Sequence, residues 1–315
     1  MLKLIVTTDL KKRVIIMNQE IKKNISKAEV LVEALPYMRK FSGTYFVVKY
    51  GGQAMVNREL MESVIIDLIL LKYIGVKPVL VHGGGKEVTE IMERLGKKPQ
   101  FVNGLRVTDD ETMEIVEMVL MGKVNQNIVS LFNQQGGKAV GFSGRDGEIL
   151  QARRLGPQVV NTNSGQESID LGRVGEIMQI NPSLIHSVSD DGYIPVISSI
   201  GAGLNGESLN INADHVAGEL AVALKAEKLI VLTDVEGIYS VKDDHQEFIS
   251  AISQGEIKAM IMQGEISGGM IPKVESCLMA LKGGVRRTHI IDGRVPHSLI
   301  LEIFTDSGIG TMVRQ

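Results

Sequence analysis

The sequence contains a single cysteine, Cys277, so it cannot form a disulfide within the chain or a cluster of thiolate metal ligands. It also lacks a long apolar run. The longest one, Ser63–Val76, is interrupted by Asp67 and Lys72 and is too short and too charged to span a bilayer. Both absences favour a soluble protein of a reducing compartment, and we expect a cytoplasmic location without a membrane partner.

A strong net charge is also missing. The formal net charge of the 315 residues is −3, which gives no general affinity for nucleic acid or acidic membrane surfaces. The first 50 residues nevertheless hold ten Lys/Arg and four Asp/Glu. Residues 1–24 are therefore either a basic docking arm or a solvated tail. At the start of the chain the apolar run Leu4–Val6 is followed by Asp9 and the Lys11–Arg13 cluster, which does not fit a signal peptide, and Met17 is an alternative start.

What the chain does have is an alternation of short apolar segments with longer helical patterns. Such β-α-β order predicts an α/β fold in which a mainly parallel sheet is covered by helices on both faces. Ligands of such sheets bind at the carboxyl ends of the strands. The expected strands are 45–50, 78–82, 139–142, 194–198, 229–233 and 288–291, and the expected helices are 58–74, 86–95, 109–132, 213–224 and 271–282. A capping box at 108–111 is expected to open the third helix.

Two segments stand outside this alternation. Gln151–Gln179 is rich in Gly, Asn and Ser and indicates a β-hairpin excursion. Residues 25–41 form an amphipathic helix, which Pro36 should kink. Its apolar face either packs on its own domain or forms an oligomer contact. That face comprises Leu31, Ala34, Leu35, Met38 and Phe41.

Glycine-rich turns follow two of the expected strands, at Lys49–Gly52 and at His82–Lys86. Glycines there let backbone N–H groups approach an anion, and a following helix adds its positive end. Neither G-x-G-x-x-G/A nor G-x-x-x-x-G-K-[ST] fits, because Val88 and Glu87 stand where other residue types are needed. His82 is either a structural residue of its turn or an acid–base group.

A third turn, Gly268–Lys273, opens a helix. A lysine at a helix start, such as Lys273, is unfavourable unless an anion lies there. The alternative is that Lys273 is an ordinary surface lysine. Asp214 is either a helix cap, like Asn212, or a functional carboxylate. Arg106, after a tight turn, can bind a carboxylate with both arms of its guanidinium.

Together these motifs resemble the amino acid kinase family, and within it the N-acetylglutamate kinases. The resemblance covers about residues 25–315. It rests on Val48–Gly52, Val81–Gly85, Asn103–Thr108, Leu209–Asp214 and Gly268–Val274, of which the third and the fifth are the most specific. It implies a three-layer αβα sandwich around an open, mainly parallel eight-stranded sheet. In that fold, residues 42–226 would bind the amino acid and residues 227–315 would bind ATP.

The resemblance also implies the role of each site residue. Lys49 and Lys273 would flank the phosphoryl group in flight, and Asp214 would orient them. N-acetyl-L-glutamate would contact Gly84, Gly85, Arg106 and Asn210. The nucleotide would be bound by Gly51, Gly52, Thr233, Asp234, Gly237, Ile238, Gly268, Gly269 and Met270. Mg²⁺ would be held by ATP phosphates and water, and by no protein side chain.

The two ends of the chain resemble the arginine-inhibited members of that family. In those members the leading helices join three dimers into a hexamer, and arginine binds beside the helix. The corresponding residues here would be Tyr37, Lys228, Glu302 and Gly308.

Two other functions are compatible with parts of the pattern. A kinase for an aminoadipate derivative would share the lysines, glycines and fold, because one extra methylene changes pocket affinity by only about 1–3 kcal/mol. A non-catalytic amino acid sensor would have no need of Lys49, Asp214 and Lys273 together.

Overall fold

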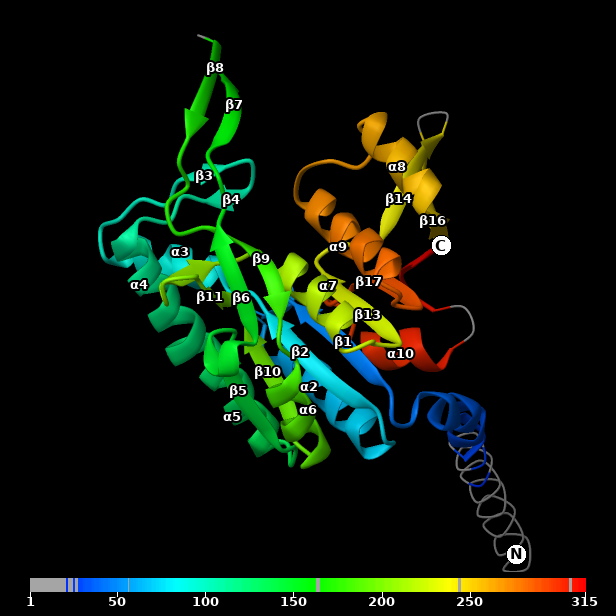
Figure 1. Cartoon of the computed structure of the whole chain (residues 1–315). Coiled ribbons are helices and arrows are strands. Elements are labelled where there is room, and N and C mark those ends of the chain that lie inside the picture. Colours follow the sequence, from blue (N-terminus) through cyan, green and yellow to red (C-terminus); the bar gives the residue numbers. More distant parts are fainter. Residues whose placement is uncertain are drawn as a thin grey trace, which may run out of the picture.

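The centre of this computed structural model is an eight-stranded sheet (Figure 1). The structure describes residues 21, 25, 28–55, 57–162, 165–242, 245–305 and 308–315. The strand order is β16-β18-β17-β13-β1-β2-β10-β5, and the pairs are parallel except β17–β18. The strands are β1 Tyr45–Tyr50, β2 Lys77–His82, β5 Ala139–Ser143, β10 Ile194–Ser198, β13 Lys228–Thr233, β16 Ala251–Ser253, β17 Arg287–Asp292 and β18 Thr311–Arg314.

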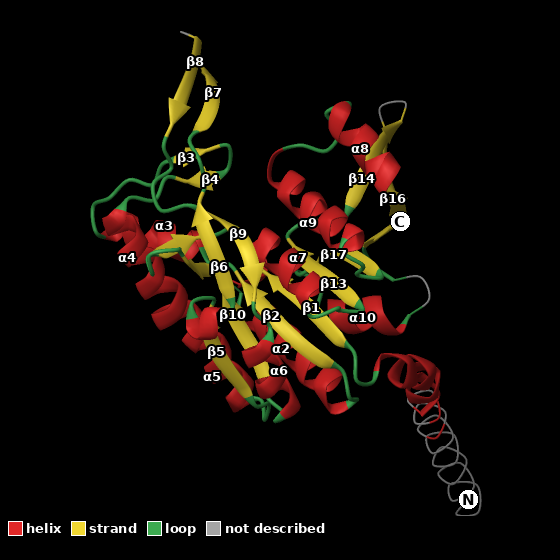
Figure 2. Ribbon diagram, in the orientation of Figure 1, coloured by secondary structure: helices red, strands yellow, loops and turns green. Residues whose placement is uncertain are grey.

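Helices cover both faces of this sheet, so the three-layer αβα prediction is confirmed (Figure 2). Successive strand residues point to opposite faces. Phe46 and Val48 of β1 therefore join one core, and Val47 joins the other. The first core contains side chains of α2 Arg58–Tyr73, α3 Gly85–Arg94, α4 Asp110–Glu117, α5 Gln126–Gln134 and α10 Ser298–Phe304. The second contains side chains of α6 Ser183–Asp190, α7 Ala213–Ala223, α8 Gln254–Met262 and α9 Ile271–Lys282.

Helix starts follow the expected capping chemistry, with one shift. Asn57 accepts hydrogen bonds from Glu59 and Leu60 N–H, as its position before α2 predicted. At α4 the capping residue is Asp109, whose carboxylate accepts from Thr112 N–H. The expected capping box at 108–111 is thus wrong by one residue, because Thr108 is extended and pairs with a neighbouring loop. The long helix runs from α4 through a π-helical segment, Met118–Asn125, into α5, which ends at Gln134, two residues beyond the expected Phe132.

The excursion predicted at 151–179 is confirmed as two antiparallel pairs. They join β6 Leu150–Arg154 to β9 Gly175–Ile180, and β7 Gln158–Thr162 to β8 Gly165–Ile169. β6 and β9 belong to a second sheet with β11 Ile200–Ala202 and β12 Ser208–Asn210. Two further hairpins are β3 Phe101–Val102 with β4 Leu105–Arg106, and β14 Ile238–Lys242 with β15 His245–Ile249. Three short 3-10 segments lie at Gly52–Met55, Asp146–Glu148 and Gly268–Met270. The β3–β4, β7–β8 and β14–β15 hairpins gather above one end of the central sheet (Figure 1).

The leading helix packs on the domain only at its carboxyl end. Residues 28–41 are helical, Pro36 included. Phe41 is buried against Phe46, with ring centroids 5.1 Å apart. Leu31 and Leu35 are 66% and 45% exposed. Most of the basic arm predicted for residues 1–24 lies outside the described residues. In the part of the chain that the structure describes, every helix is too short or too polar to cross a membrane.

Candidate active site

One carboxylate joins the two lysines that the sequence places 224 positions apart, at 49 and 273. Lys49 Nζ lies 2.8 Å from Asp214 Oδ1, and Lys273 Nζ lies 3.1 Å from Asp214 Oδ2. Lys49 points to the same face of β1 as Val47, where α7 and α9 pack. The fold therefore brings both ammonium groups to the two oxygens of one side chain.

The beginnings of α7 and α9 supply Asp214 and Lys273. Asn212 caps α7 by accepting from Asp214 N–H at 2.8 Å, so capping is done by the asparagine and the Asp214 carboxylate is left to the lysines. Lys273 is the third residue of α9, and Pro272 precedes it in the first turn. Proline is compatible with this position because its missing N–H has no partner there.

Burial and charge oppose each other in this cluster. Burial lowers the pKa of Lys49, and the Asp214 carboxylate opposes that effect without cancelling it. Burial also disfavours the carboxylate of Asp214, but Lys49 and Lys273 outweigh it and lower the pKa of Asp214. Two cations share one anion, so the cluster is left with surplus positive charge for a further anion.

The first glycine turn is built around Lys49. A Cβ at Gly51 would lie 2.8 Å from Lys49 Nζ, so any larger residue would displace the ammonium. Gly52 has φ 75° and faces the Asp234 side chain. Glycine is thus needed twice, once for space and once for its backbone conformation.

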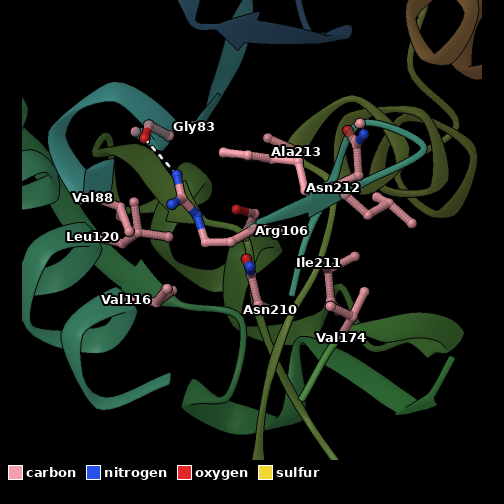
Figure 3. A pocket seen from close by; sticks show the side chains of 16 residues that line it. Gly83, Val88, Arg106, Val116, Leu120, Val174, Asn210, Ile211, Asn212 and Ala213 are labelled. Carbon is pink, nitrogen blue, oxygen red and sulfur yellow. Dashed lines mark hydrogen bonds between the residues drawn. The ribbon is translucent and has the colours of Figure 1, made fainter. Parts of the chain in front are cut away.

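A cavity of about 210 Å³ lies between the second glycine turn and the Asn210–Ala213 segment (Figure 3). Arg106 reaches across it toward the glycine turn, while Val88 and Leu120 form an apolar wall. Asn210 also lines it. A second cavity shares Gly85 and Arg106 with the first and extends to Gly52. The pocket therefore continues toward the first glycine turn.

Arg106 is 7% exposed and has no carboxylate partner among the described residues. Its Nη2 donates to Gly85 O and Thr89 Oγ1, both at 2.8 Å, and its guanidinium lies 4.7 Å from the centre of the Phe101 ring. Burial lowers its pKa. A buried cation without an anion is costly, so a ligand carboxylate is the natural partner for it.

The second glycine turn is locked by two side chains beneath it. Gly84 has φ 153°, and a Cβ there would lie 2.5 Å from Leu120. His82 Nδ1–H donates to Gly83 O at 2.7 Å, and its Nε2 accepts from Asn125 at 3.0 Å. Burial lowers the pKa of His82 to about 4, which favours the structural interpretation over an acid–base role. In a trans peptide, N–H points away from the preceding C=O, so this contact directs Gly84 N–H away from His82.

The residues proposed to bind the nucleotide differ in their surroundings. Asp234 lies beside Gly52, whereas Gly268 and Gly269 form the open turn that leads into α9. Ile238 N–H already donates to Thr311 Oγ1, and Gly237 packs against the same threonine. The remaining members are Gly51 beside Lys49, Thr233 at the end of β13 and Met270 against the second core.

The four residues proposed for the arginine site lie around the carboxyl end of the leading helix. Tyr37 packs on Phe304, two residues after Glu302, with ring centroids 6.2 Å apart. Lys228 Nζ lies 2.8 Å from His289 Nε2, and His289 Nδ1 lies 2.6 Å from Glu302 Oε1. A Cβ at Gly308 would lie 2.7 Å from Glu302 Oε2. Sequence reasoning missed His289, since within an apolar strand it carries no motif.

A buried lysine and a part-buried one lie beside a pocket that contains a buried arginine, an arrangement that suits phosphoryl transfer because that reaction needs positioning and charge neutralisation. The comparisons with known proteins agree. A model of the amino acid kinase family matches residues 44–292. The chain is 57% identical to the acetylglutamate kinase of Pelotomaculum thermopropionicum, in a match that covers 92% of this chain and 98% of that one. It is 56% identical to the acetylglutamate kinase of Heliobacterium modesticaldum, over 92% of this chain and 99% of that one. The chain belongs to the amino acid kinase family and is a kinase.

Solved structures give the same fold. The N-acetylglutamate synthase of Neisseria gonorrhoeae, complexed with coenzyme A and N-acetyl-glutamate, is 26% identical with a TM-score of 0.78. The match covers 91% of this chain and 63% of that one. Carbamate kinase from Giardia, 17% identical with a TM-score of 0.62 over 86% of this chain and 99% of the other, shares the fold alone.

Proposed function

We propose that this kinase transfers the γ-phosphoryl of ATP to the γ-carboxylate of N-acetyl-L-glutamate. The products are N-acetylglutamyl 5-phosphate and ADP, as in the second step of arginine biosynthesis. The observation that carries the proposal is the buried Arg106, which has no carboxylate of the described residues to neutralise it and lines a small cavity beside Gly84 and Gly85. The names of the close relatives support the same acceptor.

The acceptor needs no general base. A γ-carboxylate with an ordinary pKa of about 4.3 is already ionised at neutral pH. What it needs is alignment with the phosphorus and relief of charge on the transferring oxygens. In this proposal Arg106 and Asn210 bind the α-carboxylate of the substrate. Lys49 and Lys273 then neutralise the phosphoryl group in flight, and Asp214 orients them.

The donor side is assigned to residues 227–315 and the acceptor side to residues 42–226. Mg²⁺ bound to ATP would supply further neutralisation of the phosphates. Among the described residues no group of three or more His, Cys, Asp or Glu side chains could form a metal cage, and Asp214 is already paired with two lysines. These residues fit an ion held by phosphate and water. The enzyme is expected to act in the cytoplasm, where ATP is available.

An ADP-release assay tests the acceptor. Purified protein is given ATP and Mg²⁺ with N-acetyl-L-glutamate, glutamate or N-acetyl-L-aminoadipate. The proposal predicts the highest kcat/KM for N-acetyl-L-glutamate. A preference for the aminoadipate derivative would assign the enzyme to a lysine-type pathway, and absence of turnover with all three would favour a sensor.

The leading helix is proposed as the contact that assembles a hexamer from three dimers, with arginine bound at its root as an inhibitor. Support comes from the exposed Leu31 and Leu35 and from the cluster around Glu302. Deleting residues 1–41 would also remove the buried Phe41, so the Leu31→Ser/Leu35→Ser variant is the cleaner test. Light scattering should then detect dimers. Unchanged assembly and unchanged arginine response would reject this role.

A further inference from the structure

A buried threonine lies between the two residues proposed to bind the α-carboxylate. Thr108 is fully buried and follows the β4 strand that carries Arg106. Its hydroxyl donates to Arg106 O at 2.7 Å and accepts from Asn210 Nδ2 at 3.3 Å. One oxygen atom thus contacts both residues, although they are 104 positions apart in the chain.

The backbone of the excursion completes the connection. Thr108 N–H donates to Leu171 O at 2.9 Å, and Thr108 O accepts from Arg173 N–H at 2.6 Å. Arg173 O in turn accepts from Asn210 N–H at 2.8 Å. Thr108 and Asn210 are therefore joined twice, once through their side chains and once through Arg173.

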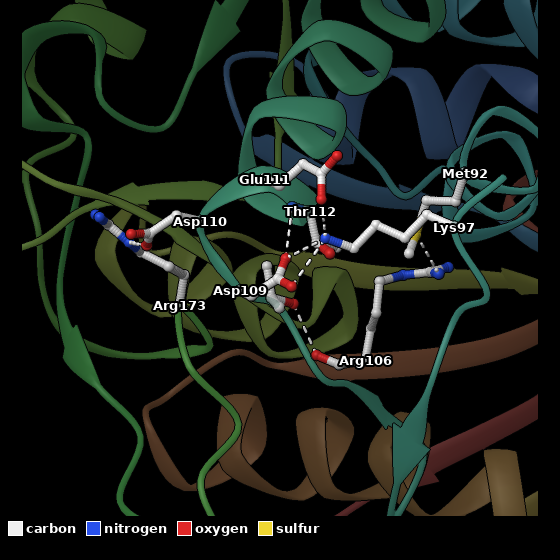
Figure 4. Close-up of polar contacts among 9 residues, drawn as sticks. Met92, Lys97, Arg106, Asp109, Asp110, Glu111, Thr112 and Arg173 are labelled. Carbon is white, nitrogen blue, oxygen red and sulfur yellow. Dashed lines mark hydrogen bonds and ion pairs between the residues drawn. The ribbon is translucent and has the colours of Figure 1, made fainter. Parts of the chain in front are cut away.

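Ion pairs lie next to this hydrogen-bonded network of Thr108, Arg173 and Asn210 (Figure 4). Arg173 Nε lies 2.6 Å from Asp110 Oδ1, so the excursion is tied to the start of α4. Lys97 lies 2.7 Å from both the Asp109 and the Glu111 carboxylates, which ties the end of α3 to the same helix start. These pairs are partly exposed, and each contributes little alone. The buried hydroxyl of Thr108 is the member that contacts both proposed ligand-binding residues.

We propose that Thr108 is a positioning residue that sets the separation and orientation of Arg106 and Asn210 for the acceptor carboxylate. This inference rests on the proposed function. Removing the hydroxyl leaves the Arg106 carbonyl and the part-buried Asn210 amide without this partner, which lets both residues move. The loss should fall on acceptor binding, because the Thr108 hydroxyl is hydrogen-bonded to Arg106 and Asn210 and, among the described residues, not to Lys49, Asp214 or Lys273.

The test is steady-state kinetics of the full-length wild type, Thr108→Val and Thr108→Ser. Valine keeps the shape of threonine and removes its hydroxyl. We expect Thr108→Val to raise the KM for N-acetyl-L-glutamate about tenfold, with kcat and the KM for ATP near their wild-type values. Thr108→Ser, which keeps the oxygen, should return the KM toward that of the wild type.

Thr311→Val is the matched control. Thr311 is also fully buried, donates to Ile249 O at 2.6 Å and accepts from Ile238 N–H at 2.8 Å, but it lies on β18. The Thr311→Val substitution removes an equivalent hydroxyl and should leave the KM for N-acetyl-L-glutamate unchanged. An unchanged acceptor KM in Thr108→Val, or an equal rise in Thr311→Val, overturns the inference. A wild type that does not phosphorylate N-acetyl-L-glutamate overturns the proposed function itself.

Discussion

Two buried carboxylates on the two sides of the sheet are bound in opposite ways. Asp214 is held by two ammonium groups, those of Lys49 and Lys273. Glu302 is held by His289 and by the N–H groups of Ile309 and Gly310, at 2.8 and 3.0 Å. Both carboxylates are less than a tenth exposed.

The partners decide what each carboxylate can do. Around Asp214 the cations outnumber the anion and face a glycine turn, so this cluster can neutralise a phosphoryl group. Around Glu302 the acceptor oxygens are occupied by backbone donors and an imidazole, so the carboxylate holds α10, β17 and the 308–310 loop together. We therefore expect substitutions at the first cluster to reduce turnover and substitutions at the second to reduce stability.

The largest effect should come from the lysines. Lys273→Ala removes one preorganised cation from the proposed phosphoryl path and should reduce kcat on the order of 100- to 1,000-fold, by analogy with the loss of one oxyanion-hole donor. Its melting temperature should stay close to that of the wild type. Lys282→Ala, on the same helix but exposed, is the control. Near-normal turnover of Lys273→Ala would remove the assigned role of this lysine.

The second effect concerns Glu302. Glu302→Gln retains the size of the side chain but weakens the hydrogen bonds from His289 and the two backbone N–H groups. We expect a loss of about 1–3 kcal/mol in the free energy of unfolding, seen as a lower melting temperature, with a smaller effect on basal turnover. The exposed Glu265→Gln gives the baseline. A variant as stable as the wild type but poor in turnover would reverse the contrast between the clusters.

A third buried carboxylate, Asp67, shows the effect of burial on a pKa when no lysine of the described residues is paired with the carboxylate. Asp67 on α2 is 1% exposed and lies 2.7 Å from His297 Nδ1, and no described lysine forms an ion pair with it. Burial raises the pKa of Asp67 to about 6, with His297 opposing the shift. The folded state then binds this proton more tightly than the unfolded state does. The stability contributed by Asp67 should therefore fall as the pH rises through 6.

Thermal unfolding at several pH values measures this effect. From Asp67, the wild type should gain about 1 kcal/mol between pH 6 and pH 5. Asp67→Asn should lack that part of the pH dependence. Identical pH slopes for the two proteins would show that His297 and the backbone cancel the effect of burial.

The smallest effect should come from an exposed ion pair of similar length. Arg153 Nε lies 2.6 Å from Glu176 Oε1, but the two side chains are 60% and 42% exposed. Arg153→Gln should change the free energy of unfolding by less than about 1 kcal/mol, and chemical denaturation can measure the change. A larger loss would mean that burial is not what separates the clusters from a surface pair.

Much of the fold could be predicted because most of the principal strands are short and mainly apolar. Apart from Lys49, Tyr45–Tyr50 consists of aromatic and β-branched residues, and it ends at a glycine turn. α6, α8 and α10 were missed because they are short, at seven to nine residues, and carry few periodic positions. The order of strands in the sheet also has no local signal, since pairing is set by packing between distant segments.

The site was predictable where a residue belongs to a motif. Lys49, Asp214 and Lys273 each stand beside a distinctive turn, and the structure brings them together. His289 was missed because a buried histidine in a strand looks ordinary in sequence, and Thr108, although it belongs to a specific motif, was expected only to cap a helix. Their importance lies in hydrogen bonds to residues 13 and 102 positions away.

The direct pairing of β1 with β13 has a consequence for dividing this chain. The two sides proposed for acceptor and nucleotide meet along a ladder of backbone hydrogen bonds in the middle of one sheet, with no linker between them. Fragments cut at 226/227 would each expose a long apolar strand edge, which invites aggregation. A split version of this enzyme should regain activity only when the two pieces are produced together and can rebuild that ladder.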